Sequence, residues 1–105
     1  MNKQAQELVA VLEEAKQLLA RPDNDFSWSY LGDAETAVAE VDGLIATIRD
    51  GGKPDVLALQ VLFTVTGPIQ EVSLSSGWAD EFLDLAQRFD HAIAPYQRQP
   101  PPPFT

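Results

Sequence analysis

The chain has 105 residues, 16 acidic against 7 basic side chains, a formal net charge of -9 and no cysteine. This length fits one domain, and the 45% share of apolar residues is typical of a globular protein. The absence of cysteine excludes disulfides, thiolate metal sites and cysteine nucleophiles. The acidity argues against nucleic acids and anionic membranes as partners, because both attract Lys and Arg.

Two helices are predicted in the N-terminal half. Apolar residues at helical spacing predict the first over residues 3–20, and Pro22 follows its end. The second begins near Asp33, a residue type that favours the N-cap, and is ended by residues 50–52, Asp-Gly-Gly. Gly43 lies inside this second helix, where we expect a neighbouring helix to pack closely against it.

The third segment, residues 56–65, has almost no polar face. A helix buried on nearly all sides and a buried strand over its later, β-branched part are both compatible with this pattern. We favour the helix, because no second strand is available to pair with it. Pro68 then begins a short helical turn over residues 68–74.

The last predicted helix covers residues 78–94, has the most regular apolar stripe, and is stopped by Pro95. The tail over residues 97–105 holds four consecutive prolines, which predict a disordered, extended segment. The sequence therefore predicts an all-α fold. It is a compact bundle of about four helices in one domain, residues 1–96, with an aromatic-rich loop after the first helix.

That loop begins with three polar residues, 23–25, whose acidic pattern is similar to the start of an EF-hand. The comparison fails, because Trp28 and Ala34 stand where a calcium loop needs glycine and glutamate. We expect turn and capping roles for these acids. Phe26 and Trp28 are predicted to plug one end of the bundle, whereas Tyr30 suits a surface role.

The acidity is concentrated in the first half of the chain. Residues 1–50 carry 10 acidic against 4 basic side chains, and residues 51–105 carry 6 against 3. An acidic face beside an aromatic loop suits a basic protein partner, since charge steers association and aromatic residues anchor it. The candidate partner contacts are Asp25, Tyr30, Asp33 and Glu35.

A second candidate site follows the apolar third segment. Its residues are Thr66, Gln70, Glu71 and Ser73, which could line a cleft for a ligand or substrate. The alternative is a helix-turn-helix corner that Gln70 and Glu71 cap. His91 is the only histidine and is interpreted as an ordinary solvated helix residue. No catalytic set, metal-ligand set or cofactor motif is predicted.

Two stretches resemble an uncharacterised family of small bacterial domains, a domain of unknown function. They are DNDFSWS at residues 23–29 and LFTVTGPIQEVSLSSGW at residues 62–78. The family pattern T-G-x-x-Q-E-x-S followed by G-W matches at Thr66, Gly67, Gln70, Glu71, Ser73, Gly77 and Trp78. Val65 stands where the family pattern has proline. The resemblance implies a natural folded module over roughly residues 20–90 and supplies no activity.

Three functions are compatible with these patterns. The first is an acidic protein–protein interaction module, such as an inhibitor or immunity-like protein for a basic partner. The second is a small ligand-binding or enzymatic domain that uses Gln70 and Glu71. The third is a structural or oligomerisation bundle, in which the chain is a homo-oligomer. No signal-peptide pattern is visible, so a cytoplasmic location is expected.

Overall fold

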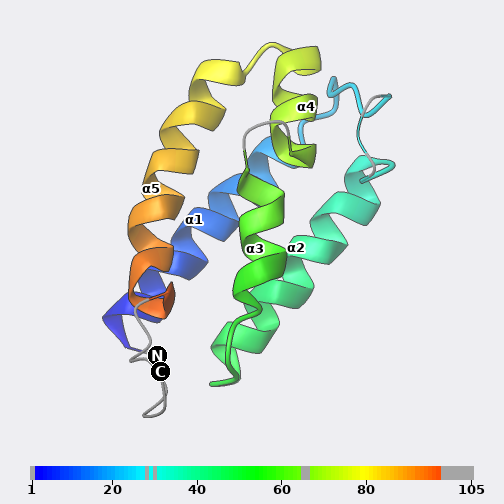
Figure 1. Cartoon of the computed structure of the whole chain (residues 1–105). Coiled ribbons are helices and arrows are strands. Elements are labelled where there is room, and N and C mark those ends of the chain that lie inside the picture. The colour runs from blue at the N-terminus through cyan, green and yellow to red at the C-terminus, as the bar shows by residue number, and fades with distance from the viewer. Residues whose placement is uncertain (1, 28, 30, 65–66, 98–105) are drawn as a thin grey trace.

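The computed structural model describes residues 2–27, 29, 31–64 and 67–97. Within these residues every regular element is a helix, as Figure 1 shows. The helices are α1 (Lys3–Leu19), α2 (Ala34–Arg49), α3 (Val56–Phe63), α4 (Pro68–Ser76) and α5 (Ala79–Gln97). The predicted all-α bundle is confirmed, the third segment is helical and not a strand, and the short turn after Pro68 is a nine-residue helix.

The longest helices, α1 and α5, lie side by side and run in opposite directions (Figure 1). Helix α2 packs chiefly against α1, whereas α3 and α4 pack against α5 and against each other. The start of α1 and the end of α5 lie at the same end of the bundle, where Asn2 and Tyr96 line a common hollow. The contact between α1 and α5, which we call the seam, therefore runs along the length of the bundle.

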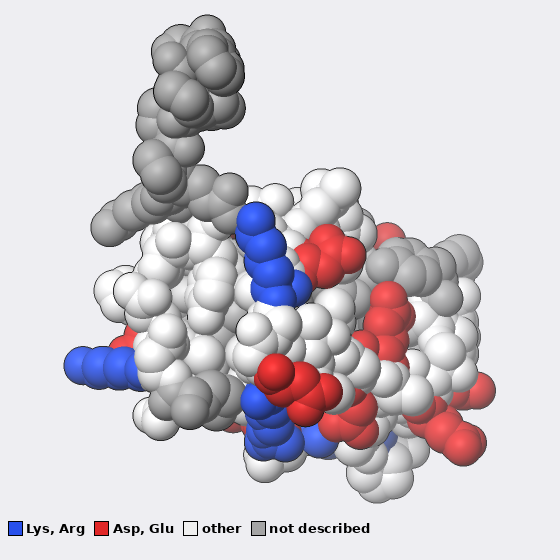
Figure 2. All heavy atoms as spheres, turned by 90° about the horizontal axis from the view of Figure 1, so that it is seen from below, with Lys and Arg blue, Asp and Glu red and all other residues white. Residues whose placement is uncertain are grey.

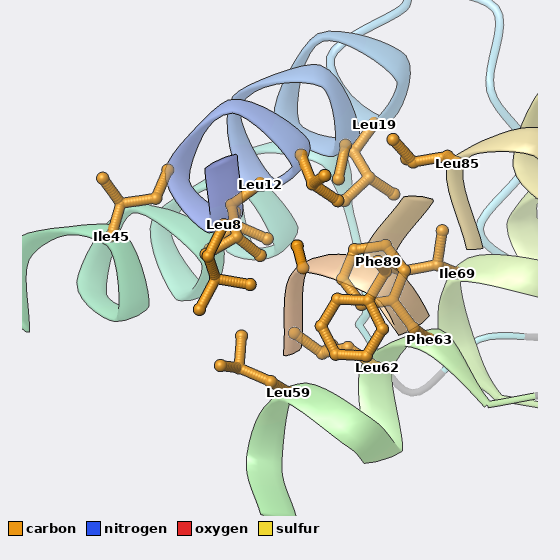
Figure 3. Close-up of a cluster of buried hydrophobic side chains, with 14 of the residues drawn as sticks. Leu8, Leu12, Leu19, Ile45, Leu59, Leu62, Phe63, Ile69, Leu85 and Phe89 are labelled. Atoms are coloured by element: carbon orange, nitrogen blue, oxygen red, sulfur yellow. The ribbon is translucent and has the colours of Figure 1, made fainter. Parts of the chain in front are cut away.

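All five helices contribute to one hydrophobic core, shown in Figure 3. Leu8, Leu12 and Leu19 of α1 are fully buried. The rings of Phe63 and Phe89 stack with their centroids 4.2 Å apart, which joins α3 to α5. Offset or stacked aromatic pairs of this kind add to the stabilisation that burial alone gives.

Side-chain caps determine where three of the helices begin. The Oδ1 atoms of Asn2, Asp33 and Asp55 accept hydrogen bonds from backbone amides of the first turns of α1, α2 and α3, at 2.8, 2.7 and 3.1 Å. These bonds satisfy amide groups that a helix start leaves without a partner. The predicted N-cap at Asp33 is confirmed, and Gly51 closes α2 with a positive φ of 80°.

Helix α3 is less buried than predicted. Leu59, Leu62 and Phe63 face the core, but Leu57 and Val61 are 70% and 43% exposed. The expectation of a helix buried on nearly all sides is therefore wrong. The reason is that α3 packs on α4 and α5 along one face only, which leaves its opposite apolar side in contact with solvent.

Helix α5 is longer than predicted, since it continues through Pro95 to Gln97. A proline inside a helix removes one backbone hydrogen bond and crowds the carbonyl four residues earlier. In α5 that carbonyl belongs to His91, and Tyr96, the residue after Pro95, packs against the core. Packing therefore outweighs the helix-breaking tendency of Pro95. Residues 98–105, for which a disordered tail is predicted, lie outside the described residues.

The stretch Val56–Ser76 is long and apolar enough to cross a membrane by length and composition alone, with a mean hydropathy of 1.3. Core helices of water-soluble proteins pass the same test. In this structure Gly67 separates α3 from α4, and half of the stretch's most apolar window is buried inside the bundle. The stretch is therefore only a weak sign of a membrane span.

Gly43 does not have the packing role predicted for it. It is exposed, and a Cβ atom built on it meets nothing within 4 Å. We therefore expect Gly43→Ala to raise the free energy of unfolding by about 1 kcal/mol, because alanine restricts the unfolded chain and favours the helix. Urea denaturation followed by circular dichroism measures this change. Gly51→Ala, at a positive φ, is the control and should lower stability. A loss of stability in Gly43→Ala would contradict the prediction.

Candidate functional site

Asn24 in the loop after α1 forms hydrogen bonds with two neighbouring helix ends. Its Nδ2 donates to the carbonyl oxygens of Leu18 and Leu19 at 2.7 and 3.0 Å, at the end of α1. Its Oδ1 accepts from the indole Nε1 of Trp78 at 2.8 Å, just before α5. Trp78 is 2% exposed, and a buried indole N–H needs such a partner. One amide side chain therefore joins two helix ends.

Two further hydrogen bonds join the same loop to α4. The backbone amide of Asp25 donates to Ser76 Oγ at 2.8 Å, and Ser29 Oγ donates to the carbonyl oxygen of Pro68 at 3.2 Å. We call Asn24, Asp25 and Ser29, with their partners in residues 68–78, the loop clamp. The two segments that carry the family resemblance thus contact each other, and these contacts are structural.

Two of the predicted partner contacts, Asp25 and Asp33, accept hydrogen bonds from residues two or three positions further along the chain. Asp25 is half-buried, and hydrogen bonds from the hydroxyl and amide of Ser27 hold the pKa of its carboxyl below its ordinary value. The amide and hydroxyl of Thr36 lower the pKa of Asp33 in the same way at the start of α2. The structure therefore supports the predicted capping roles of both acids.

The aromatic plug is seen in part. Phe26 is half-buried and packs against the core, as predicted. Trp28 and Tyr30, the other two aromatic residues of the predicted set, lie outside the described residues. Leu31 is 1% exposed and anchors the end of the loop, which the sequence reasoning missed. Leu31 breaks the alternation that drew attention to the aromatic residues, so period-two reasoning passed over it.

Glu35 is exposed on α2 and, with Asp42, borders a shallow hollow of about 310 Å³. The floor of this hollow is made of small apolar side chains: Ala20, Ala34, Val38 and Ala39. Among the predicted partner contacts that the structure describes, Glu35 lines one of the five main hollows, whereas Asp25 and Asp33 line none of these five. The structure does not gather Asp25, Asp33 and Glu35 into one pocket.

The second candidate site lies on α4. Ser73 is fully buried, its hydroxyl donates to the carbonyl of Gln70 at 2.7 Å, and its own carbonyl accepts from the Trp78 amide at 3.0 Å. Gln70 and Glu71 are half-buried. None of these three residues lines any of the five main hollows of the described residues. Thr66 lies outside the described residues. The geometry favours the corner interpretation of this segment.

A larger groove that the sequence reasoning missed runs along the seam of α1 and α5. Two hollows of about 570 and 380 Å³ meet at Arg88, and apolar residues such as Val11, Leu18 and Leu85 form their floor. We call these two hollows the seam groove. Its charged or titratable lining residues are Glu7, Glu14, Arg21, Asp80, Glu81, Asp84, Arg88 and His91.

Two ion pairs cross the seam groove. Arg88 Nη1 lies 2.6 Å from Glu14 Oε2, and Arg21 Nη2 lies 2.7 Å from Glu81 Oε2. The hydrogen bond from Arg88 lowers the pKa of Glu14, and Glu14 in turn raises the pKa of Arg88. Glu14 lies on α1 and Arg21 lies two residues beyond the end of α1, whereas Glu81 and Arg88 both lie on α5. Seven residues separate the members of each set, so the two pairs match in the antiparallel arrangement.

Carboxylates outnumber cations along this groove. Five acidic side chains line it, against two arginines that are both already paired with them. His91 is exposed at the rim, in agreement with its interpretation as a solvated residue. On the end face in Figure 2, most acidic side chains gather toward one side, while Lys and Arg lie both beside them and at the opposite edge. The acidic excess is therefore unevenly distributed over that face.

Within the described residues, no group of three or more His, Asp or Glu side chains is placed to hold a metal ion. The resemblance to the family of small bacterial domains stays a prediction. Comparisons with protein-family models, with curated proteins and with solved structures found no match to this chain.

Proposed function

We propose that this protein is an acidic protein-binding module whose seam groove receives a basic segment of a partner protein. The observation that carries this proposal is the lining of the groove, in which five carboxylates face two arginines over an apolar floor. An inhibitor or immunity-like protein would use such a groove to cover a basic surface of its target.

The chemistry of the groove suits Arg and Lys side chains. Their aliphatic stems can cover apolar surface such as Val11 and Leu85 while their charged heads reach carboxylates at the rim. The net charge of -9 adds long-range attraction, which speeds encounter with a basic protein and weakens as salt is added. Apolar contact and charge therefore favour the same class of partner.

The test measures binding of a fluorescent nona-arginine peptide by fluorescence anisotropy. The salt concentration is about 50 mM, at which attraction between charges is only weakly screened. Glu14→Gln/Glu81→Gln removes two carboxylates from the groove. Each is worth about 0.7 kcal/mol in a partly exposed pair, so we expect the Kd to rise about tenfold. High salt should weaken binding to every variant.

The matched control is Glu35→Gln/Glu40→Gln, which removes the same net charge from exposed positions on α2. We expect its Kd to change less than about twofold. Equal losses in the two double variants would show binding by net charge and overturn the groove. A wild-type protein that does not bind the peptide even at low salt would overturn the proposed function.

A further inference from the structure

We infer that Arg21 and Arg88 are internal competitors, which hold the groove's carboxylates in the free protein and are displaced by two cations of the partner. The inference rests on the proposed function and adds a partner geometry and a regulation to it. Its starting point is that Arg88 on α5 reaches across the groove to Glu14 on α1, and Arg21, just past the end of α1, reaches across it to Glu81 on α5.

Both ion pairs are accessible to a competitor. The side chains of Arg21 and Glu81 are 41% and 53% exposed, and those of Arg88 and Glu14 are 46% and 47% exposed. Ion pairs this exposed contribute little stability, because water already solvates both partners. A partner's guanidinium can therefore replace the internal one at low cost, and it makes the same charge-assisted hydrogen bonds.

The spacing of the pairs defines the partner. On α5, seven helical residues separate Glu81 from Arg88, which is about 10.5 Å at a rise of 1.5 Å per residue. A partner helix that lies along the seam presents two arginines at this distance when they are at positions i and i+7. The expected ligand is therefore a helical segment with arginines one heptad apart on one face.

Internal competition has a consequence that ordinary stabilising ion pairs lack. While an internal arginine is paired with a carboxylate, that carboxylate cannot bind the partner. The apparent affinity for the partner therefore falls in proportion to the fraction of protein in which the carboxylate is free. Removing Arg21 and Arg88 should therefore tighten binding by about tenfold or more, if each occupies its carboxylate most of the time. If the arginines served the partner, their removal would weaken binding.

The experiment measures binding of an alanine-based helical peptide with arginines at i and i+7. A peptide of identical composition with arginines at i and i+5, which point to different faces, is the ligand control. Arg21→Gln/Arg88→Gln is compared with Lys3→Gln/Lys53→Gln, which removes equal charge from two residues without ion pairs in the described part of the chain.

We expect the arginine variant to bind the i, i+7 peptide about tenfold or more tightly, and the lysine variant to change by less than about twofold. Circular dichroism checks folding, and Arg21→Gln alone, expected to tighten binding by about threefold, replaces the double variant if that does not fold. Equal tightening in both variants, weaker binding in the arginine variant, or no preference between peptides would overturn the inference and leave the proposed function standing. If the wild type and every variant failed to bind either peptide or nona-arginine, the proposed function would fail.

Discussion

Replacing Asn24 with alanine is expected to lower the free energy of unfolding by about 2–4 kcal/mol. The substitution removes both bonds to the end of α1 and leaves the buried Nε1 of Trp78 without its acceptor. A buried donor that loses its partner costs about 1–3 kcal/mol by itself. Thermal and urea unfolding followed by circular dichroism measure the loss, which would lower the Tm by roughly 10–25 °C for a domain of this size.

Asp23→Ala is the matched control for Asn24→Ala, because Asp23 is exposed in the same loop. It should change stability by less than about 0.5 kcal/mol. A double-mutant cycle with Trp78→Phe, which lacks the indole N–H, isolates the energy of the Asn24–Trp78 bond. A cost below about 0.5 kcal/mol for Asn24→Ala, or no coupling in the cycle, would contradict the role assigned to the loop clamp.

Gly67→Ala is expected to destabilise the protein by about 1–3 kcal/mol. A Cβ atom at this position would lie 2.7 Å from the carbonyl oxygen of Val61 and 2.8 Å from that of Thr64. Both are backbone atoms, so relief requires the chain between α3 and α4 to shift. The expected result is a lower urea midpoint, with further broadening of the transition if the corner rearranges.

The same change at Gly43 gives the comparison for Gly67→Ala, since one glycine is crowded by backbone and the other faces open space. If Gly67→Ala lowers the free energy of unfolding and Gly43→Ala raises it, the close approach of backbone atoms explains the need for glycine at position 67. The general flexibility of glycine would then not be the reason. A Gly67→Ala protein as stable as the wild type would show that the corner relaxes freely. The glycine of the family-like T-G segment would then need another explanation.

Much of the fold can be predicted because local signals agree with it. The apolar stripes of α1 and α5, the cap at Asp33 and the closing glycine at position 51 all appear in the structure where the pattern predicts them. Each depends on residues within one or two turns of each other, so a single sequence contains the information.

The predictions that failed concern packing between distant segments. Which side of α3 meets solvent, what surrounds Gly43 and whether Pro95 ends α5 depend on how the helices are arranged, and helical period alone does not give that arrangement. The seam groove was missed for the same reason. Arg21 and Glu81 are 60 residues apart in the chain and become neighbours only in the folded bundle.

The candidate site was partly predictable. Capping by Asp25 and Asp33 follows from the chemistry of short acidic side chains in turns, and the structure agrees with it. The reversed charges at positions 14 and 21 and at positions 81 and 88 could have indicated an antiparallel pair of helices. That signal becomes specific only when the pairing of the first and last helices is known.

The unequal support of the helices implies unequal resistance to local opening. Helix α2 packs chiefly on α1, whereas α5 is held by three other helices. Detaching α2 exposes chiefly its interface with α1, so it costs less free energy than unfolding the whole domain. Backbone amide hydrogens of α2 should exchange with solvent through this partial opening, whereas those of α5 should exchange only when the whole domain unfolds. Amide protection should therefore differ between α2 and α5, although both belong to the same core.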